Sequence, residues 1–147
     1  MYKRILVATD ATPLSKKAVA HAIGLAASTG AELVVLTVTQ RYPVSYMEGA
    51  VAFEAIDVAK IEKQWTEQGR ALVDRYVQQA EAKGVLARAA VAKSDLVAES
   101  IIAAAAKHKV DLIVMASHGR KGIKRLLMGS ETLNVLTHSG TPVLVLR

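Results

Sequence analysis

Hydrophobic residues along this chain follow two alternating patterns. Short continuous apolar runs such as 5–8 and 33–36 are typical of strands that are buried on both faces. Between these runs, apolar residues recur at spacings of three and four, which predicts amphipathic helices. The predicted order is strand 3–10, helix 13–30, strand 32–38, helix 56–83, strand 85–92, helix 95–108, strand 111–116, helix 130–138 and strand 142–146.

Turn and cap residues support these boundaries. The expected helix starts are Thr12 or Asp10 with Pro13 in the first turn, Ser94 or Asp95, and Ser130, and the expected helix ends are Gly30, Gly84 and Gly140. Gly69 is expected to loosen the long second helix, because glycine is a poor helix former. Segment 39–53 shows no periodicity and contains Pro43 and Gly49, so it is expected to be a long loop, either a functional lid or a disordered segment.

Strict alternation of strands and helices predicts an α/β fold with an open five-stranded parallel sheet and helices on both faces. Each strand-helix-strand unit is expected to be parallel and right-handed. The strand at 85–92 is interrupted by Arg88, which suits an edge position. A length of 147 residues is that of one domain, so we expect residues 1–147 to form a single domain.

Composition narrows the possible function. The chain has no cysteine, which excludes disulfides and thiolate metal sites. No apolar run approaches the ~20 residues that span a bilayer, and no signal-peptide core is visible, so a cytoplasmic protein is expected. The net charge is +6 and the pI about 9.7, but the basic residues are spread thinly without an aromatic platform, which disfavours nucleic acid as a partner. The excess charge is either a solvated surface or partly serves a phosphorylated ligand.

The stretch 111–130 has the pattern of a phosphate site. It begins as a strand, passes through Gly119 and a basic segment, and reaches Gly129 and Ser130 at a predicted helix start, where backbone N–H groups can face an anion. The Walker tripeptide is absent, and no glycine follows the first strand, so neither common nucleotide fingerprint applies. From spacing alone, a phosphate cradle and a simple turn with a helix cap remain equally open.

Several stretches of the chain resemble the universal stress protein family, whose fold is similar to that of adenine-nucleotide α-hydrolases. The matching stretches are 114–122, 126–130, 135–136 and 142–145, supported by 5–10 with Ser15 and by 36–38. The nucleotide-binding branch has a glycine, two residues, a second glycine, nine residues, and a glycine followed by Ser or Thr. Here Gly119, Gly129 and Ser130 match that pattern, and Ala116 stands at the first glycine position.

The resemblance implies a nucleotide site and the residues that form it. Asp10 would reach the ribose or a phosphate-bound Mg or Mn ion, the Val38 backbone would bond the adenine edge, and the start of the last helix would hold phosphates. The charge of Glu131 must then point away from those phosphates. The implied nucleotide-contacting residues are Ala8, Thr9, Asp10, Val38, Ala116, Ser117, His118, Gly119, Arg120, Gly122, Gly129, Ser130, Glu131 and Thr132.

The resemblance also implies a function, namely binding of ATP, or of ADP or AMP, by a homodimer that acts in the stress response. The last strand, 142–146, is expected to pair with its counterpart in a second copy, and an exposed apolar edge independently predicts pairing. Two alternatives stay open. Ala116 and Glu131 favour a branch that binds no nucleotide and serves as a dimeric interaction scaffold. Slow ATP hydrolysis is the other, although no paired general base is visible in the sequence.

Overall fold

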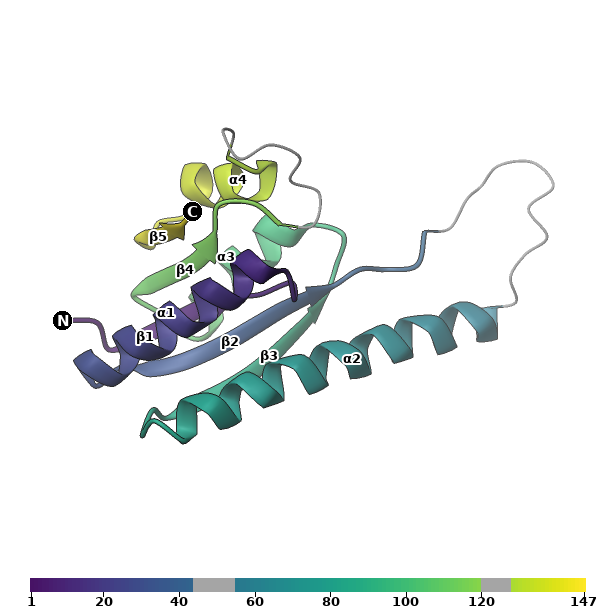
Figure 1. Ribbon diagram of the computed structural model, residues 1–147. Coiled ribbons are helices and arrows are strands. Elements are labelled where there is room, and N and C mark those ends of the chain that lie inside the picture. Colours follow the sequence, from purple (N-terminus) through teal and green to yellow (C-terminus); the bar gives the residue numbers. More distant parts are fainter. Residues whose placement is uncertain (44–54, 120–127) are drawn as a thin grey trace.

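The computed structural model describes residues 1–43, 55–119 and 128–147, and its elements follow the predicted alternation (Figure 1). Each predicted strand and helix is present, with its ends shifted by a few residues. The elements are β1 (Arg4–Ala8), α1 (Pro13–Thr29), β2 (Glu32–Thr39), α2 (Ala55–Glu81), β3 (Ala87–Lys93), α3 (Val97–Lys107), β4 (Leu112–Ala116), α4 (Ser130–His138) and β5 (Val143–Leu146). Most of the loop predicted at 39–53 lies outside the described residues.

The five strands form one parallel sheet in the order β3-β2-β1-β4-β5. The predicted fold class is therefore confirmed, and β3 lies at an edge as expected. Helices α1 and α2 cover one face of the sheet, and α3 and α4 cover the other (Figure 1). Both faces of the central strands are consequently buried, which explains why their sequences are continuously apolar.

Side chains of the central strands alternate between the two hydrophobic layers. In β1, Ile5 packs toward α1 and α2, whereas Leu6 packs toward α3 and α4. In β4, Val114 packs toward α1 and α2, and Ile113 packs toward α3 and α4. All four side chains are fully buried, because successive strand residues face opposite sides of the sheet. The core is therefore two aliphatic layers separated by the sheet.

Helix α1 begins and ends at the residues that the sequence indicates. Thr12 is the N-cap, and its hydroxyl oxygen accepts the Ser15 amide at 3.3 Å. Asp10, the other predicted cap residue, is therefore not the N-cap. Gly30 ends the helix with φ of 72°, in the left-handed region that glycine enters without steric penalty.

The role expected for Gly69 in α2 is wrong. A Cβ at this position would lie 2.9 Å from Cγ2 of Thr39 and 3.1 Å from Cγ2 of Thr37. Gly69 is buried, and it allows the helix backbone to lie directly against the end of β2. Gly69 therefore serves close packing between α2 and the sheet instead of loosening the helix.

The predicted caps of α3 and α4 also need correction. The N-cap of α3 is Leu96, which makes no side-chain cap bond, and the Ser94 hydroxyl instead accepts the Leu96 amide at 3.0 Å. The N-cap of α4 is Gly129, so Ser130 is the first helical residue and does not cap. Helix α4 ends at Ser139 in extended conformation, without a left-handed glycine at 140. The first turns of both helices must therefore be held by other contacts.

A polar cluster ties the amino ends of the strands together. The Asp111 carboxylate accepts the amides of Lys3 at 2.8 Å and Arg4 at 3.1 Å. Burial raises the pKa of Asp111, but these amides outweigh it and the pKa lies below its ordinary value. The Arg4 guanidinium donates to the Glu32 carboxylate at 2.8 Å and to the His108 carbonyl at 2.7 Å. These bonds close this end of the sheet, and the carboxyl end of the strands is the one left for a ligand.

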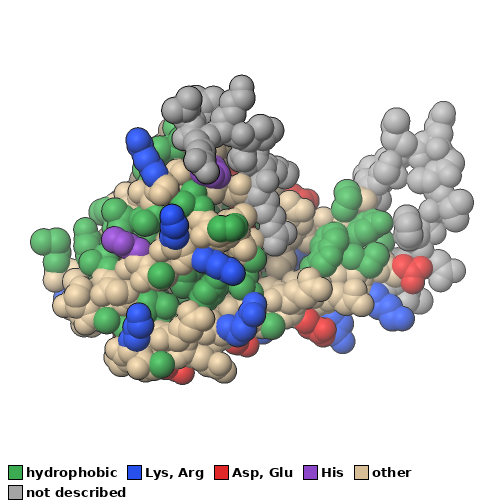
Figure 2. All heavy atoms as spheres, viewed as in Figure 1, with side chains coloured by type: hydrophobic (Ala, Val, Ile, Leu, Met, Phe, Trp, Pro, Cys, Tyr) green, Lys and Arg blue, Asp and Glu red, His purple; other side chains and the backbone are tan. Residues whose placement is uncertain are grey.

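The surface over α1 and α2 carries single basic side chains. Figure 2 shows Lys and Arg side chains spread over this face without one dense cluster. Such a distribution is that of a solvated surface. No helix in the described part of the chain is long and apolar enough to cross a membrane.

Candidate functional site

The chain leaves β1 and β4, which are neighbours in the sheet, toward opposite faces. After β1 it enters α1 on one face, and after β4 it reaches α4 on the other. In parallel α/β sheets this divergence opens a crevice at the carboxyl ends of the two strands, where ligands bind. Most of the predicted site residues lie on the segments that leave these two strands.

Asp10 lies on the β1 side of the crevice in a fixed orientation. Its Oδ1 atom accepts the Thr12 hydroxyl at 2.6 Å and the Thr12 amide at 3.1 Å. The Ser15 hydroxyl in turn donates to the Thr12 carbonyl at 2.9 Å. Thr12 is not among the predicted site residues, although Asp side chains in turns are known to bond the backbone two residues on.

The other carboxylate oxygen of Asp10 faces the loop that follows β4. A Cβ added to Gly119 would lie 2.6 Å from Oδ2 of Asp10, closer than real contacts allow. The loops after β1 and β4 therefore approach each other so closely that only glycine, which has no Cβ, fits at position 119. Asp10 and Gly119, which are 109 positions apart in the sequence numbering, are thus in close contact just beyond the carboxyl ends of β1 and β4.

Ala8 and Thr9 shape the β1 side without offering side-chain groups to a ligand. Ala8 is the last residue of β1 and packs toward α3 and α4. Thr9 is buried, its amide donates to the Leu36 carbonyl at 2.9 Å, and its hydroxyl lies 3.1 Å from that of Ser15. The carbonyl of Thr9 accepts the Thr37 hydroxyl at 2.8 Å. These bonds fix the chain just before Asp10.

Val38 extends the site toward β2. The last aligned pair between β1 and β2 is Ala8 with Leu36, so Val38 lies beyond the end of β1. Leu36 directs its carbonyl toward β1, and Thr39 directs its own toward Ser94 on the β3 side. Because backbone groups alternate along a strand, the N–H and C=O of Val38 face the same side as those of Leu36. They therefore face the open region past β1.

Ala116 takes the ordinary conformation of a strand residue. Within the described part of the chain, the non-glycine residues with positive φ are Ala11 at 68° and Lys109 at 52°. Ala116 ends β4, is 8% exposed, and its carbonyl accepts the Thr132 hydroxyl at 2.9 Å. Alanine therefore fits this position without backbone strain.

Ser117 and His118 carry the chain from β4 toward the crevice. The Ser117 amide donates to the Leu146 carbonyl of β5 at 2.7 Å, and its hydroxyl lies 3.1 Å from Nδ1 of His118. Ser117 is buried and His118 is half-buried. The predicted residues Arg120 and Gly122 lie outside the described residues.

Gly129 packs against the backbone of the loop after β4. Its amide donates to the Ser117 carbonyl at 2.8 Å, and an added Cβ would lie 3.1 Å from Cα of His118 and 3.3 Å from the Ser117 oxygen. The amide predicted to face a phosphate at this residue therefore already has a backbone acceptor. Gly129 instead brings the start of α4 into contact with the end of β4.

The next three residues carry the amides that a helix start leaves unpaired. The first intrahelical bond of α4 runs from the Leu133 amide to the Gly129 carbonyl at 3.0 Å. The amides of Ser130, Glu131 and Thr132 consequently have no acceptor within the helix. Together with the positive end of the helix dipole, three such amides can hold an anion.

Glu131 directs its carboxylate away from the crevice, as the sequence reading requires. Its Oε2 atom accepts the Ala98 amide in the first turn of α3 at 3.0 Å. This bond was not predicted, because α3 was expected to be capped by Ser94 or Asp95. Asp95 instead accepts the Arg41 amide at 3.1 Å. Glu131 thus completes the cap of α3 from a position 33 residues away in the sequence, and local sequence patterns carry no signal for such a pair.

A shallow hollow between α2 and β3 lies apart from this crevice. It is lined by Ala59, Glu62, Lys63, Thr66, Glu67 and Lys93. Glu62 accepts the Lys93 ammonium and the Tyr42 amide, each at 2.9 Å, and these two bonds lower the pKa of Glu62. The hollow holds a surface ion pair beside the stacked rings of Tyr42 and Trp65. Its polar groups are thus already paired with each other.

No dedicated metal centre is present among the described residues. Across 1–43, 55–119 and 128–147, no group of three or more His, Cys, Asp and Glu side chains could hold an ion.

Comparison with known proteins agrees with the geometry. The model of the Universal stress protein family matches residues 1–147. The universal stress protein MJ0531 of Methanocaldococcus jannaschii is 30% identical, covering all of this chain and 83% of that protein. YxiE of Bacillus subtilis is 32% identical over the full length of both proteins.

Solved structures give the same result at the level of the fold. The protein MJ0577 superimposes with a TM-score of 0.83 and 27% identity, covering 99% of this chain and 96% of that one. UspA from Lactobacillus plantarum has a TM-score of 0.85 at 21% identity, covering 99% and 98%. A universal stress protein solved in complex with cAMP has a TM-score of 0.67 and 25% identity, covering 98% and 95%. With the family model matching from end to end, the chain belongs to the universal stress protein family.

Proposed function

We propose that this chain binds ATP, or ADP or AMP, in the crevice between β1 and β4, and acts in the cytoplasm as a nucleotide-responsive homodimer in the stress response. The observation that carries the proposal is the approach of Gly119 to Asp10, where an added Cβ would lie 2.6 Å from the carboxylate. It brings the segments after β1 and β4 together at the position where α/β sheets bind nucleotides.

Each part of an adenine nucleotide has a suitable group along this crevice. The Asp10 carboxylate can accept two ribose hydroxyl hydrogens, or face Mg²⁺ or Mn²⁺ bound to the phosphates. The backbone of Val38 offers a donor and an acceptor to the adenine edge. The amides of Ser130, Glu131 and Thr132 would hold phosphates at the start of α4.

Known relatives favour adenine over other bases. One universal stress protein that superimposes on this chain was solved with cAMP, and another, from Archaeoglobus fulgidus, was solved with dAMP. Both ligands are adenine nucleotides. The ordinary backbone of Ala116 also supports the proposal, since this residue does not need the positive φ that would favour glycine.

Addition of ATP with magnesium should stabilise the protein in a concentration-dependent way. A ligand that binds only the folded state raises the free energy of unfolding by about 2.7 kcal/mol at one hundred times its dissociation constant. Thermal unfolding and titration calorimetry with ATP, AMP and GTP would measure this. An absent heat signal and an unchanged melting temperature at millimolar ATP would contradict the proposal.

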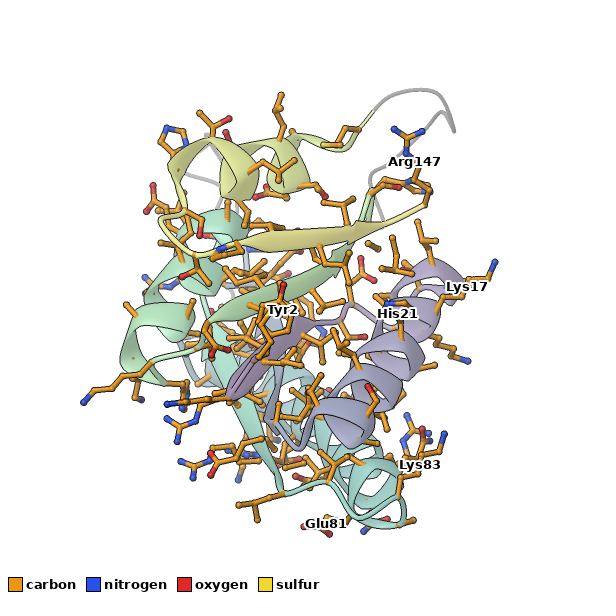
Figure 3. All side chains as sticks on the ribbon, turned by 90° about the vertical axis from the view of Figure 1, so that its left-hand side faces the viewer. Tyr2, Lys17, His21, Glu81, Lys83 and Arg147 are labelled. Atoms are coloured by element: carbon orange, nitrogen blue, oxygen red, sulfur yellow. The ribbon has the colours of Figure 1, made fainter. Side chains whose placement is uncertain are left out.

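The homodimer is proposed through the edge strand β5. Figure 3 shows β5 along the side of the molecule turned toward the viewer, with Arg147 at its end. All four of its residues are half-buried, whereas the residues of the neighbouring strand β4 are buried. An apolar edge strand with open backbone groups is a template for pairing with a second copy.

Val145→Pro should convert the proposed dimer into a monomer. The Pro142 carbonyl accepts the amide of Ile113 in β4, and the Leu146 carbonyl accepts that of Ser117 just after β4, so the backbone groups of Val145 face outward by alternation. Proline removes the outward N–H while leaving the bonds to β4 in place. Light scattering at micromolar concentration would show the change, and Val145→Thr, which keeps the N–H, is the control. A monomeric unmutated protein would contradict the dimer.

A scaffold role is the second candidate, and exposed leucines favour it. Leu96 is 58% exposed at the start of α3, and Leu133 is 55% exposed on α4. Exposed apolar groups on neighbouring helices are features of protein contact surfaces. These leucines lie outside the proposed nucleotide crevice, so binding of a protein partner and binding of ATP can be tested separately.

A further inference from the structure

The first turn of α4 is held at three points. The Gly129 amide donates to the Ser117 carbonyl at 2.8 Å, and the Thr132 hydroxyl donates to the Ala116 carbonyl at 2.9 Å. Both of these bonds attach the turn to the end of β4. The third bond, from the Ala98 amide to the Glu131 carboxylate at 3.0 Å, attaches it to α3. It is the one of these three bonds that joins the turn to α3 instead of to the end of β4.

The bond to α3 satisfies two requirements at once. Leu96, the N-cap of α3, provides no side-chain cap bond, so the Ala98 amide needs an acceptor from elsewhere. The Glu131 carboxylate belongs to the same turn whose amides are proposed to hold phosphates, where a free negative charge would oppose an anionic ligand. Binding at Ala98 caps α3 and places that charge at the positive end of a second helix dipole.

We propose that Glu131 is a positioning residue for the phosphates of the nucleotide. Anchored on the Ala98 amide, it fixes the orientation of the first turn of α4 and keeps its own charge out of the crevice. This inference rests on the proposed nucleotide site. It concerns ligands with phosphates, because the contacts expected for ribose and adenine lie on Asp10 and Val38.

The segment that receives Glu131 also supports the opposite side of the crevice. The Ser94 amide donates to the Thr39 carbonyl at 2.9 Å, and Asp95 accepts the Arg41 amide at 3.1 Å. The connection between β3 and α3 is therefore bonded to the end of β2, and the first turn of α3, which follows it, is bonded to the start of α4. Fixing α4 to this turn would set the phosphate side of the proposed site relative to its adenine side.

The test compares three variants by titration calorimetry with ATP, AMP and adenosine. Glu131→Ala should weaken ATP binding about tenfold, which corresponds to the loss of one charge-assisted hydrogen bond. Adenosine affinity should stay unchanged, because adenosine has no phosphate. Glu131→Gln should bind ATP almost as the unmutated protein does, since its amide oxygen can still accept from Ala98. Glu99→Ala, which removes an exposed acid from the same turn of α3, should have no effect.

A measurement without ligand checks the anchor itself. In Glu131→Ala, hydrogen exchange at the Ala98 amide should become faster, and in Glu131→Gln it should stay close to that of the unmutated protein. Unchanged exchange in Glu131→Ala, or equal loss of affinity for ATP and adenosine, overturns the inference. If Glu131→Ala binds ATP as the unmutated protein does, the inference alone fails. If the unmutated protein binds no ATP, the proposed function fails and the inference fails with it.

Discussion

Gly129→Val should abolish ATP binding while leaving the protein folded. The new Cβ would lie 3.1 Å from Cα of His118 and 3.3 Å from the Ser117 oxygen, so backbone atoms on both sides must separate. The first turn of α4 would move away from β4 and take the amides of Ser130, Glu131 and Thr132 with it. Loss of two hydrogen bonds to charged phosphate, at about 1.5 kcal/mol each, weakens binding about a hundredfold or more.

Gly140→Val is the matched control for this experiment. A Cβ at Gly140 would meet no atom within 4 Å, and this glycine lies just beyond the other end of α4. Calorimetry should find ATP binding unchanged in the control. Gly129→Val that binds ATP normally would show that the start of α4 does not hold phosphates. Binding of a partner protein by the same variant, together with loss of ATP, would support the scaffold role.

Gly69→Ala should destabilise the protein although alanine is the better helix former. Inside a helix, alanine stabilises the folded protein by about 0.5–1 kcal/mol relative to glycine. At this position its Cβ would lie 2.9 Å from Cγ2 of Thr39 and 3.1 Å from Cγ2 of Thr37, so α2 must shift away from β2. Overpacking of this kind lowers stability by about 1–3 kcal/mol, which exceeds the gain in helix propensity.

Gly24→Ala provides the matched comparison. Gly24 lies in the middle of α1, it is exposed, and a Cβ there would meet nothing within 4 Å. Its replacement should therefore raise the free energy of unfolding by about 0.5–1 kcal/mol. Urea denaturation would measure the change in the free energy of unfolding in both variants, and the two changes should have opposite signs. Equal stabilisation by the two substitutions would show that α2 can shift away from the sheet without any loss of stability.

The order of elements could be read from the sequence because each signal is local. Continuous apolar runs mark strands buried on both faces, and Thr12 and Gly30 mark the ends of α1 through bonds within a few residues. The two leading site segments, around Asp10 and around Gly119 to Gly129, were also visible, because glycines and a carboxylate stand directly after predicted strands. Their resemblance to one family specified the type of ligand.

Contacts between distant segments could not be read in this way. Gly69 appeared as a weak point of a helix until Thr37 and Thr39 were placed against it. Glu131 appeared as an unfavourable charge until the Ala98 amide was placed beside it. In both cases the deciding atom lies 30 or more positions away, and no periodicity relates the two positions.

The sequence by itself determined the α/β architecture through periodicity and turn residues, and it indicated the family and the segments of the proposed nucleotide site through its motifs. The tertiary structure alone decided how those segments meet. It placed Asp10 against Gly119, assigned the Gly129 amide to Ser117, and turned Glu131 toward α3. Such pairings depend on how closely the elements pack, and those distances are set only once the sheet and both helical layers are assembled.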